Sequence, residues 1–272
     1  PLIRRLVDHG VSFRSQGRPH GNNVIVISLP DREGAFPWEQ TYMWSREMGT
    51  SEDCVKSALM ALEAWAHRRI EAGEPFEKVL ADVLGQPNAP ACYLLVAVDL
   101  LLSHWPKSRD AIIPFLACPE LLCLDRERHA HDGYEYPDIF GLKALQKEPG
   151  GAASNASLKE RASRQLSLDN YIGHYAVYGP DILRDDLTVL LRKAAERLGP
   201  PDAQSDLGDP ALMVVHALNL ADPANWSEKT VKLKDGSLTT VCEYAPPQSE
   251  AEHLKPMQDA QQERLRDMKM QA

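Results

Sequence analysis

Two histidines stand at alternate positions of the segment LLCLDRERHAHDGYEYPDIFG: His129 and His131, followed directly by Asp132. Imidazole nitrogens and carboxylates are the groups that bind zinc or transfer protons in hydrolases. One hypothesis for this chain is therefore a metal-dependent hydrolase that uses these three side chains, with help from Asp99 or His174.

The spacing of the two histidines favours a different interpretation. Alternate residues of a helix point roughly 200° apart, so they cannot hold one ion together, whereas in an extended segment they would face the same side. The apolar sequence before His129 is typical of a helix whose charged end meets solvent, and H-E-x-x-H spacing is absent. The sequence therefore predicts a solvated helix end, with no metal at His129 or His131.

Asp99 is the other residue whose position suggests chemistry, because it interrupts the most apolar stretch, ACYLLVAVDLLLSHW. A buried carboxylate is costly unless it is paired, so we expect Asp99 either to lie at a helix edge or to pair with an arginine such as Arg68 or Arg69. His216 lies in an apolar helical pattern and is predicted to be a core histidine with its hydrogen bonds satisfied.

Composition and motifs exclude several classes of function. The net charge is −9 and no run of Lys or Arg forms a phosphate-binding patch, so a nucleic-acid partner is not predicted. The five cysteines form neither a disulfide framework nor a zinc spacing, and no P-loop, G-x-G-x-x-G or G-x-S-x-G motif is present, so no cofactor is predicted. The longest apolar stretch contains Asp99 and is too short to span a membrane, which predicts a cytoplasmic chain.

Amphipathic helical patterns follow one another closely from Thr50 onwards and predict a mainly α fold. Their lengths suggest stacked helix pairs, as in HEAT-like or irregular α-solenoids, with a small β-hairpin that turns at Asp235 and Gly236. The predicted parts are an irregular segment with one short strand (1–50), a helical core (51–147), a loop (148–160), a second helical part (161–228), and the β-hairpin with a C-terminal helix (229–272).

Three stretches together resemble a known family: FPWEQTYMWSRE at 36–47, ALMALEAWAHRRIEAGE at 58–74, and DLLLSHWPKSRDAIIPFLACPELLCLDRER at 99–128. They are similar to a helical region of very large bacterial ATP-binding proteins, some of which resemble STAND-type NTPases of antiviral defence. The resemblance covers about a third of the chain and rests on packing residues, so it transfers no functional residue. It implies a non-catalytic helical part of a larger ATPase.

The aromatic stretch at 36–44 is the predicted contact surface, because Phe36, Trp38, Tyr42 and Trp44 lie within it and aromatic residues are enriched at interface centres. The expected partners are other domains of the same protein or a separate protein. The alternative is that the rings close the local core, with Tyr42 and its charged neighbours Arg46 and Glu47 as an exposed rim.

Overall fold

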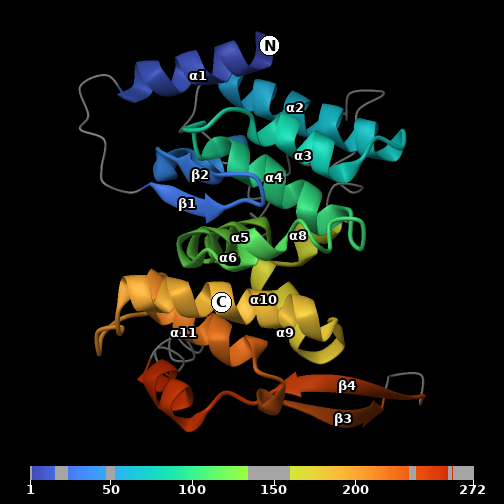
Figure 1. The fold of residues 1–272 in the computed structure, drawn as a ribbon, viewed down its shortest axis with the longest axis vertical. Helices are drawn as coiled ribbons and strands as arrows, with labels where there is room; N and C mark the ends of the chain where they lie inside the picture. Colours follow the sequence, from blue (N-terminus) through green and yellow to red (C-terminus); the bar gives the residue numbers. More distant parts are fainter. Residues whose placement is uncertain are drawn as a thin grey trace, which may run out of the picture. The chain divides into compact units, whose positions relative to one another are not determined.

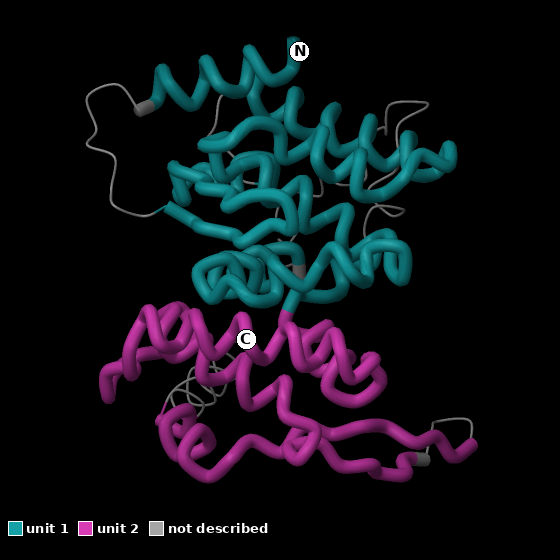
Figure 2. Tube along the Cα trace, in the orientation of Figure 1, with its two compact units in different colours: residues 1–168 teal, residues 169–272 magenta. Residues whose placement is uncertain are grey.

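The computed structural model describes residues 2–15, 24–46, 53–133, 160–232, 237–256 and 259 of the 272-residue chain. Contacts divide the chain into two units, Pro1–Leu168 and Asp169–Ala272 (Figure 2). Helices predominate in both, so the predicted mainly α class with a small β-hairpin is confirmed. Among the described residues, no helix has both the length and the apolar character needed to cross a membrane.

Unit 1 surrounds one apolar helix, α4 (Cys92–Ser103). Every residue from Cys92 to Leu102 is buried, and α4 packs against helices on several sides (Figure 1). Its neighbours are η1 (Glu39–Ser45), α2 (Asp53–Glu71), α3 (Phe76–Leu84) and α8 (Ala162–Gln165). The all-round apolar pattern of this stretch therefore has the expected cause, which is burial on all sides.

Local signals in the sequence correctly mark the helices around α4. Pro75 precedes α3 and Gly85 ends it with a positive φ of 71°, a conformation that glycine adopts without a Cβ clash. Two further helices, α5 (Ile113–Leu116) and α6 (Pro119–Gly133), are separated where Pro119 starts a new helix.

The prediction of an irregular segment with one strand at residues 1–50 is wrong. Leu2–Ser15 forms the helix α1, which packs on α2 with Val7 and Val11 buried. Gly10 permits this approach, since a Cβ there would clash with Val55 of α2. The predicted strand exists as β1 (Ile25–Ser28), and it pairs antiparallel with a second strand, β2 (Glu33–Phe36), that lacks an alternating apolar pattern.

The described residues of unit 2 form three longer helices and the β-hairpin. The helices are α9 (Leu168–Tyr178, whose first residue belongs to unit 1), α10 (Asp181–Leu198) and α11 (Pro210–Ala221), and the short helix η3 (Pro223–Asn225) follows them. Asp209 caps α11 by accepting a hydrogen bond from the backbone N–H of Ala211 at 2.9 Å.

The predicted hairpin is present as β3 (Trp226–Lys232) and β4 (Leu238–Tyr244), paired antiparallel from Trp226 opposite Tyr244 to Lys232 opposite Leu238. Residues 248–256 are helical, in agreement with a predicted C-terminal helix. The predicted turn residues Asp235 and Gly236, and the predicted loop at 148–160 apart from Glu160, lie outside the described residues. The units meet in sequence at Leu168 rather than at that loop.

Candidate functional site

The histidine pair lies on helix α6, as the helical interpretation predicts. Because α6 is helical through Gly133, His129 and His131 leave the helix in nearly opposite directions and do not converge. The Asp132 carboxylate accepts hydrogen bonds from Arg128 at 3.1 Å and Arg164 at 3.2 Å, and His131 Nδ1 lies 4.0 Å from it. The prediction of a solvated helix end is wrong, because the side chains of Arg128 and Asp132 are only 1% and 5% exposed. His174, the other predicted helper, belongs to unit 2.

The predicted aromatic contact surface is mostly part of the core. Phe36 and Tyr42 are each 1% exposed and Trp44 is 7% exposed, while Trp38 is half-buried. Arg46 is also buried, so the rim predicted at Tyr42 and Arg46 is wrong, and Glu47 lies outside the described residues. Large apolar side chains are usually buried in the core of their own unit, so an aromatic-rich stretch does not by itself indicate a contact surface.

Asp99 is buried and paired, but not with either predicted arginine. Its Oδ2 accepts a 2.6 Å hydrogen bond from Arg46, a residue 53 positions away that follows η1. Arg69 instead pairs with Glu74 and Asp82 on the surface of unit 1. Sequence neighbourhood suggested the wrong arginine because tertiary packing, not chain distance, brings the guanidinium to Asp99.

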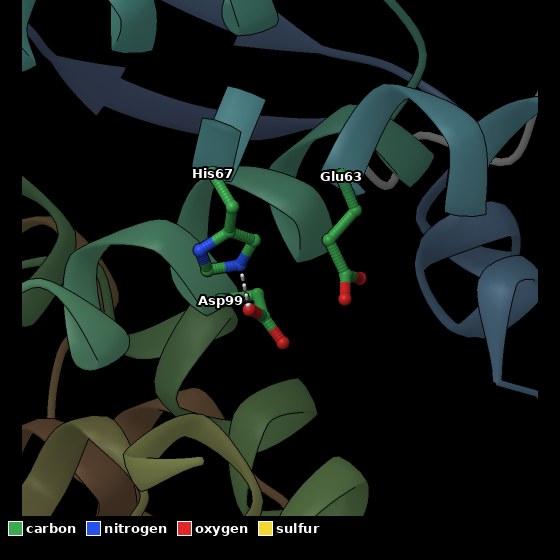
Figure 3. Close-up of side chains that lie close together, drawn as sticks. All are labelled: Glu63, His67 and Asp99. Carbon is green, nitrogen blue, oxygen red and sulfur yellow. Dashed lines mark hydrogen bonds and ion pairs between the residues drawn. The ribbon is translucent and has the colours of Figure 1, made fainter. Parts of the chain in front are cut away.

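Asp99 belongs to a cluster with Glu63 and His67 of α2, in which all three side chains point toward one another (Figure 3). Glu63 and His67 are four residues apart and so lie on the same face of α2, which packs on α4. His67 Nε2 lies 2.8 Å from Asp99 Oδ1. The three side chains place one carboxylate–imidazole pair and a second carboxylate in the centre of unit 1.

A second histidine extends the pair towards the surface. His67 Nδ1 lies 2.8 Å from Nε2 of His104, the half-buried residue that ends α4. Since ionised Asp99 can only accept, His67 Nε2 carries a proton, and its Nδ1 shares one further proton with His104. Asp99, His67 and His104 therefore form a hydrogen-bonded chain from the buried carboxylate to a partly exposed ring.

The pKa values of Glu63 and Asp99 are shifted in opposite directions. Burial and then the negative charge of Asp99 raise the pKa of Glu63 to about 7, against the opposing effect of Arg46. Burial also disfavours ionisation of Asp99, but the hydrogen bond from His67 and the charge of Arg46 outweigh it and lower the pKa of Asp99. Burial, followed by the neighbouring His67, lowers the pKa of His104 to about 4. Asp99 is thus the fixed negative charge and Glu63 the group that titrates near neutrality.

The cluster continues through α6 as a buried ion-pair network. The Arg128 guanidinium donates to Asp125 Oδ1 at 2.7 Å, and both side chains are almost fully buried. Tyr42 O–H lies 3.4 Å from the same Asp125 oxygen, so the predicted contact residue Tyr42 is a hydrogen-bonding member of the core. Asp132 links this part to Arg164, which connects the network to α8.

Glu63, His67 and Asp99 each offer one possible metal-ligand atom, and these atoms lie within 4.8 Å of one another. Two observations weigh against a cation there. The Arg46 guanidinium bridges the carboxylates, with Nη1 lying 3.2 Å from Glu63 Oε2 in ion-pair but not hydrogen-bonding geometry. His67 Nε2 must also give up its proton before it can bind a metal, yet that proton serves Asp99. The arrangement fits an internally neutralised charge cluster better than a metal centre.

Unit 2 has a separate polar cluster around Glu250. This carboxylate is 2.5 Å from His216 Nδ1 and accepts hydrogen bonds from Asn219 at 2.5 Å and Tyr244 at 2.8 Å. The prediction of a satisfied core histidine at His216 is confirmed. The cluster ties helical residues 248–256 to α11 and β4.

The sequence contains a signal for the unit 1 cluster that motif reasoning misses. Glu63 and His67 fall within the apolar helical pattern of Leu59, Leu62 and Ala66, where polar residues are unexpected unless they meet a buried partner. Asp99 in an apolar helix is the matching signal, although neither pattern says that Arg46 joins them. Neither a protein-family model nor a curated protein matches the chain.

Proposed function

We propose that this chain is a non-catalytic helical scaffold or sensor segment of a larger bacterial ATPase, and that it acts through contacts with other domains of the same protein or with a protein partner. The observation that carries the proposal is the state of the unit 1 cluster. Its carboxylates are engaged by Arg46 and Arg161 of the chain itself and are almost fully buried, which suits structural charge pairing better than turnover of a substrate. The resemblance of three stretches to helical regions of large ATP-binding proteins supports the proposal that the chain is part of a larger ATPase.

The surface of α1 supports a contact function. Leu2, Leu6 and Phe13 lie on one face of this helix and are 80%, 40% and 60% exposed, respectively. Val7 and Val11 on the other face are buried against the rest of unit 1. Grouped exposed apolar side chains commonly mark protein contacts, so α1 replaces the aromatic stretch at 36–44 as the proposed surface.

The coding sequence that flanks this chain in its gene tests the ATPase part of the proposal. We expect a P-loop motif in the same open reading frame. An open reading frame that ends close to residues 1 and 272 with no P-loop would remove the ATPase part and leave only a separate partner.

A binding assay with the adjoining segments of the parent protein tests the contact part. Replacing Phe13 by Ser is expected to weaken binding about tenfold, as loss of an apolar residue near an interface centre commonly does. Ile182→Ser is the matched control, because Ile182 is 70% exposed on α10 of unit 2. Circular dichroism should first confirm that both variants fold. Equal affinity of Phe13→Ser and wild type would remove α1 from the contact.

A further inference from the structure

Residues 160–167, here named the connector, lead into helix α9 and include the short helix α8. The connector buries little apolar surface, because Ala162 and Leu166 are its apolar residues and both are half-buried. Leu168, directly after it, is fully buried. Apolar packing therefore anchors Leu168 but contributes little to holding the connector on unit 1.

Charged side chains of unit 1 hold the connector instead. The guanidinium of Arg128 donates to the backbone carbonyl of Ser163 and, at 2.8 Å, to that of Leu166. Ser163 Oγ donates to Asp99 Oδ2 at 2.8 Å. The same buried charges that form the core network thus hold both the backbone and a side chain of the connector.

Two arginines of the connector complete these contacts. Arg161 Nη1 donates to Glu63 Oε1 at 3.2 Å, and Arg164 Nη1 donates to Asp132 Oδ1 at 3.2 Å. The connector is consequently held by polar groups from α2, α4 and α6.

A segment held this way detaches at lower cost than an apolar one. The net free energy of buried ion pairs and hydrogen bonds is small, because desolvation offsets most of their attraction. When the connector leaves, Asp99 keeps its bonds with Arg46 and His67, and Arg128 keeps its bonds with Asp125 and Asp132. Neither buried charge is therefore left without a partner. The helix α4, by contrast, can leave only by exposing its apolar side chains.

We propose that the connector is a releasable segment, which detaches reversibly from unit 1 with Leu168 as its fixed end while α2, α4 and α6 remain folded. Detachment exposes the carboxylates of Glu63 and Asp99 and frees residues 160–167, while Leu168 keeps the start of α9 in place. The proposal concerns the chain alone and stands independently of the contact function.

Hydrogen exchange of the full chain, followed by mass spectrometry, tests the proposal. The reporters are the amide N–H groups of Arg164 and Leu166, which donate to the carbonyls of Arg161 at 2.9 Å and Ala162 at 2.8 Å. We expect them to exchange faster than the amides of α4 and to respond little to low urea, because a local opening exposes little surface. Equal protection and equal urea dependence in the connector and α4 would show that the connector opens only by global unfolding.

Variants connect the opening to the polar contacts. Ser163→Ala removes the hydrogen bond to Asp99 and should speed exchange in the connector about tenfold, the effect expected for a bond to a charged acceptor, with α4 unchanged. Ser108→Ala is the matched control, since Ser108 is buried in unit 1 and donates to the carbonyl of Leu101 at 2.6 Å, outside the connector. An equal effect of both variants on the connector, or equal acceleration of α4 by Ser163→Ala, would contradict the proposal.

Discussion

The side chain of Asp99 illustrates how single residues of this protein are balanced. It receives hydrogen bonds from His67, Arg46 and Ser163, which come from three different parts of unit 1. These partners lower the pKa of Asp99 and keep it ionised in the interior. Burial and the charge of Asp99 instead raise the pKa of Glu63 to about 7, so Glu63 titrates near neutral pH. The two carboxylates therefore make opposite contributions to stability as the pH changes.

The raised pKa of Glu63 predicts a specific pH dependence of the free energy of unfolding. The pKa is about 7 in the folded chain and 4.5 as its ordinary value, so between these values the folded state retains a proton that the unfolded state has lost. The contribution of Glu63 is thus fully present below about pH 4.5 and is lost as the pH rises towards 7, by up to about 1.4 kcal/mol per pH unit. The glutamine of the Glu63→Gln variant cannot titrate. The free energy of unfolding of the wild type minus that of the variant, measured by urea denaturation, should therefore fall from pH 5 to pH 7.

For His104→Gln we expect the opposite pH dependence of the free energy of unfolding, which serves as an internal check. The pKa of His104 is lowered to about 4 from 6.5, so the unfolded state binds the proton more readily between these values. The free energy of unfolding of the wild type minus that of His104→Gln should therefore rise from pH 4 to pH 6.5 in urea denaturation. A Glu63→Gln difference that stays constant from pH 5 to pH 7 would contradict the assignment of Glu63 as the titrating group.

At the scale of elements, α2 has two different faces with different tasks. One face carries Leu62, which is 5% exposed, together with Glu63 and His67 of the charge cluster. The other carries Met60, which is 47% exposed. Apolar packing on α4 fixes the position of α2, and that position brings the polar residues of the same helix to Asp99.

Leu62→Ala tests the apolar face of α2. Removing a buried leucine side chain leaves a cavity, so the free energy of unfolding should fall by about 2–5 kcal/mol. Met60→Ala shortens an exposed side chain on the same helix and should cost less than about 0.5 kcal/mol. Urea denaturation measures both values, and a loss at Leu62 as small as that at Met60 would mean that Leu62 does not pack in the core.

At the scale of the whole molecule, the net charge bears on the partner that we propose. The net charge is −9, with 39 acidic residues against 30 Lys and Arg. Several arginines are already engaged with carboxylates inside unit 1 or on its surface, among them Arg46, Arg69 and Arg128. The net negative charge opposes approach to a polyanion. The exposed apolar side chains on α1 are the surface that we propose for a protein partner.

The charge balance predicts no measurable affinity for DNA. Fluorescence anisotropy of a labelled duplex should stay unchanged when the chain is added at about 0.1 M salt, because nonspecific binding requires Lys or Arg to neutralise phosphates. The same duplex with a basic DNA-binding protein serves as the positive control. Saturable binding that weakens steeply with salt would contradict this prediction and point to a basic surface.

Periodicity in the sequence is sufficient to predict the mainly α class, with helices that follow one another from Thr50 onwards, and the β-hairpin. These features depend on local rules, namely apolar spacing, proline and glycine at helix ends, and alternation in strands. The helical geometry of His129 and His131 also followed from sequence, since alternate residues of a helix diverge whatever surrounds them. By contrast, the sequence analysis misses α1 although Ile3, Val7 and Val11 recur at four-residue steps, because charged and polar residues surround them. It misses β2 because the sequence EGAF lacks an alternating apolar pattern and the strand depends on pairing with β1.

Only the tertiary structure decided which charged groups meet. Arg46 reaches Asp99 across 53 residues, and Ser163 reaches it across 64, distances over which local patterns carry no information. Tyr42 and Trp44 were assigned to a surface from their residue types, yet packing around α4 places them in the core. The physical reason is the same in each case: burial and charge pairing depend on all the elements that surround a side chain, whereas helix and strand formation depends mainly on its neighbours in the chain.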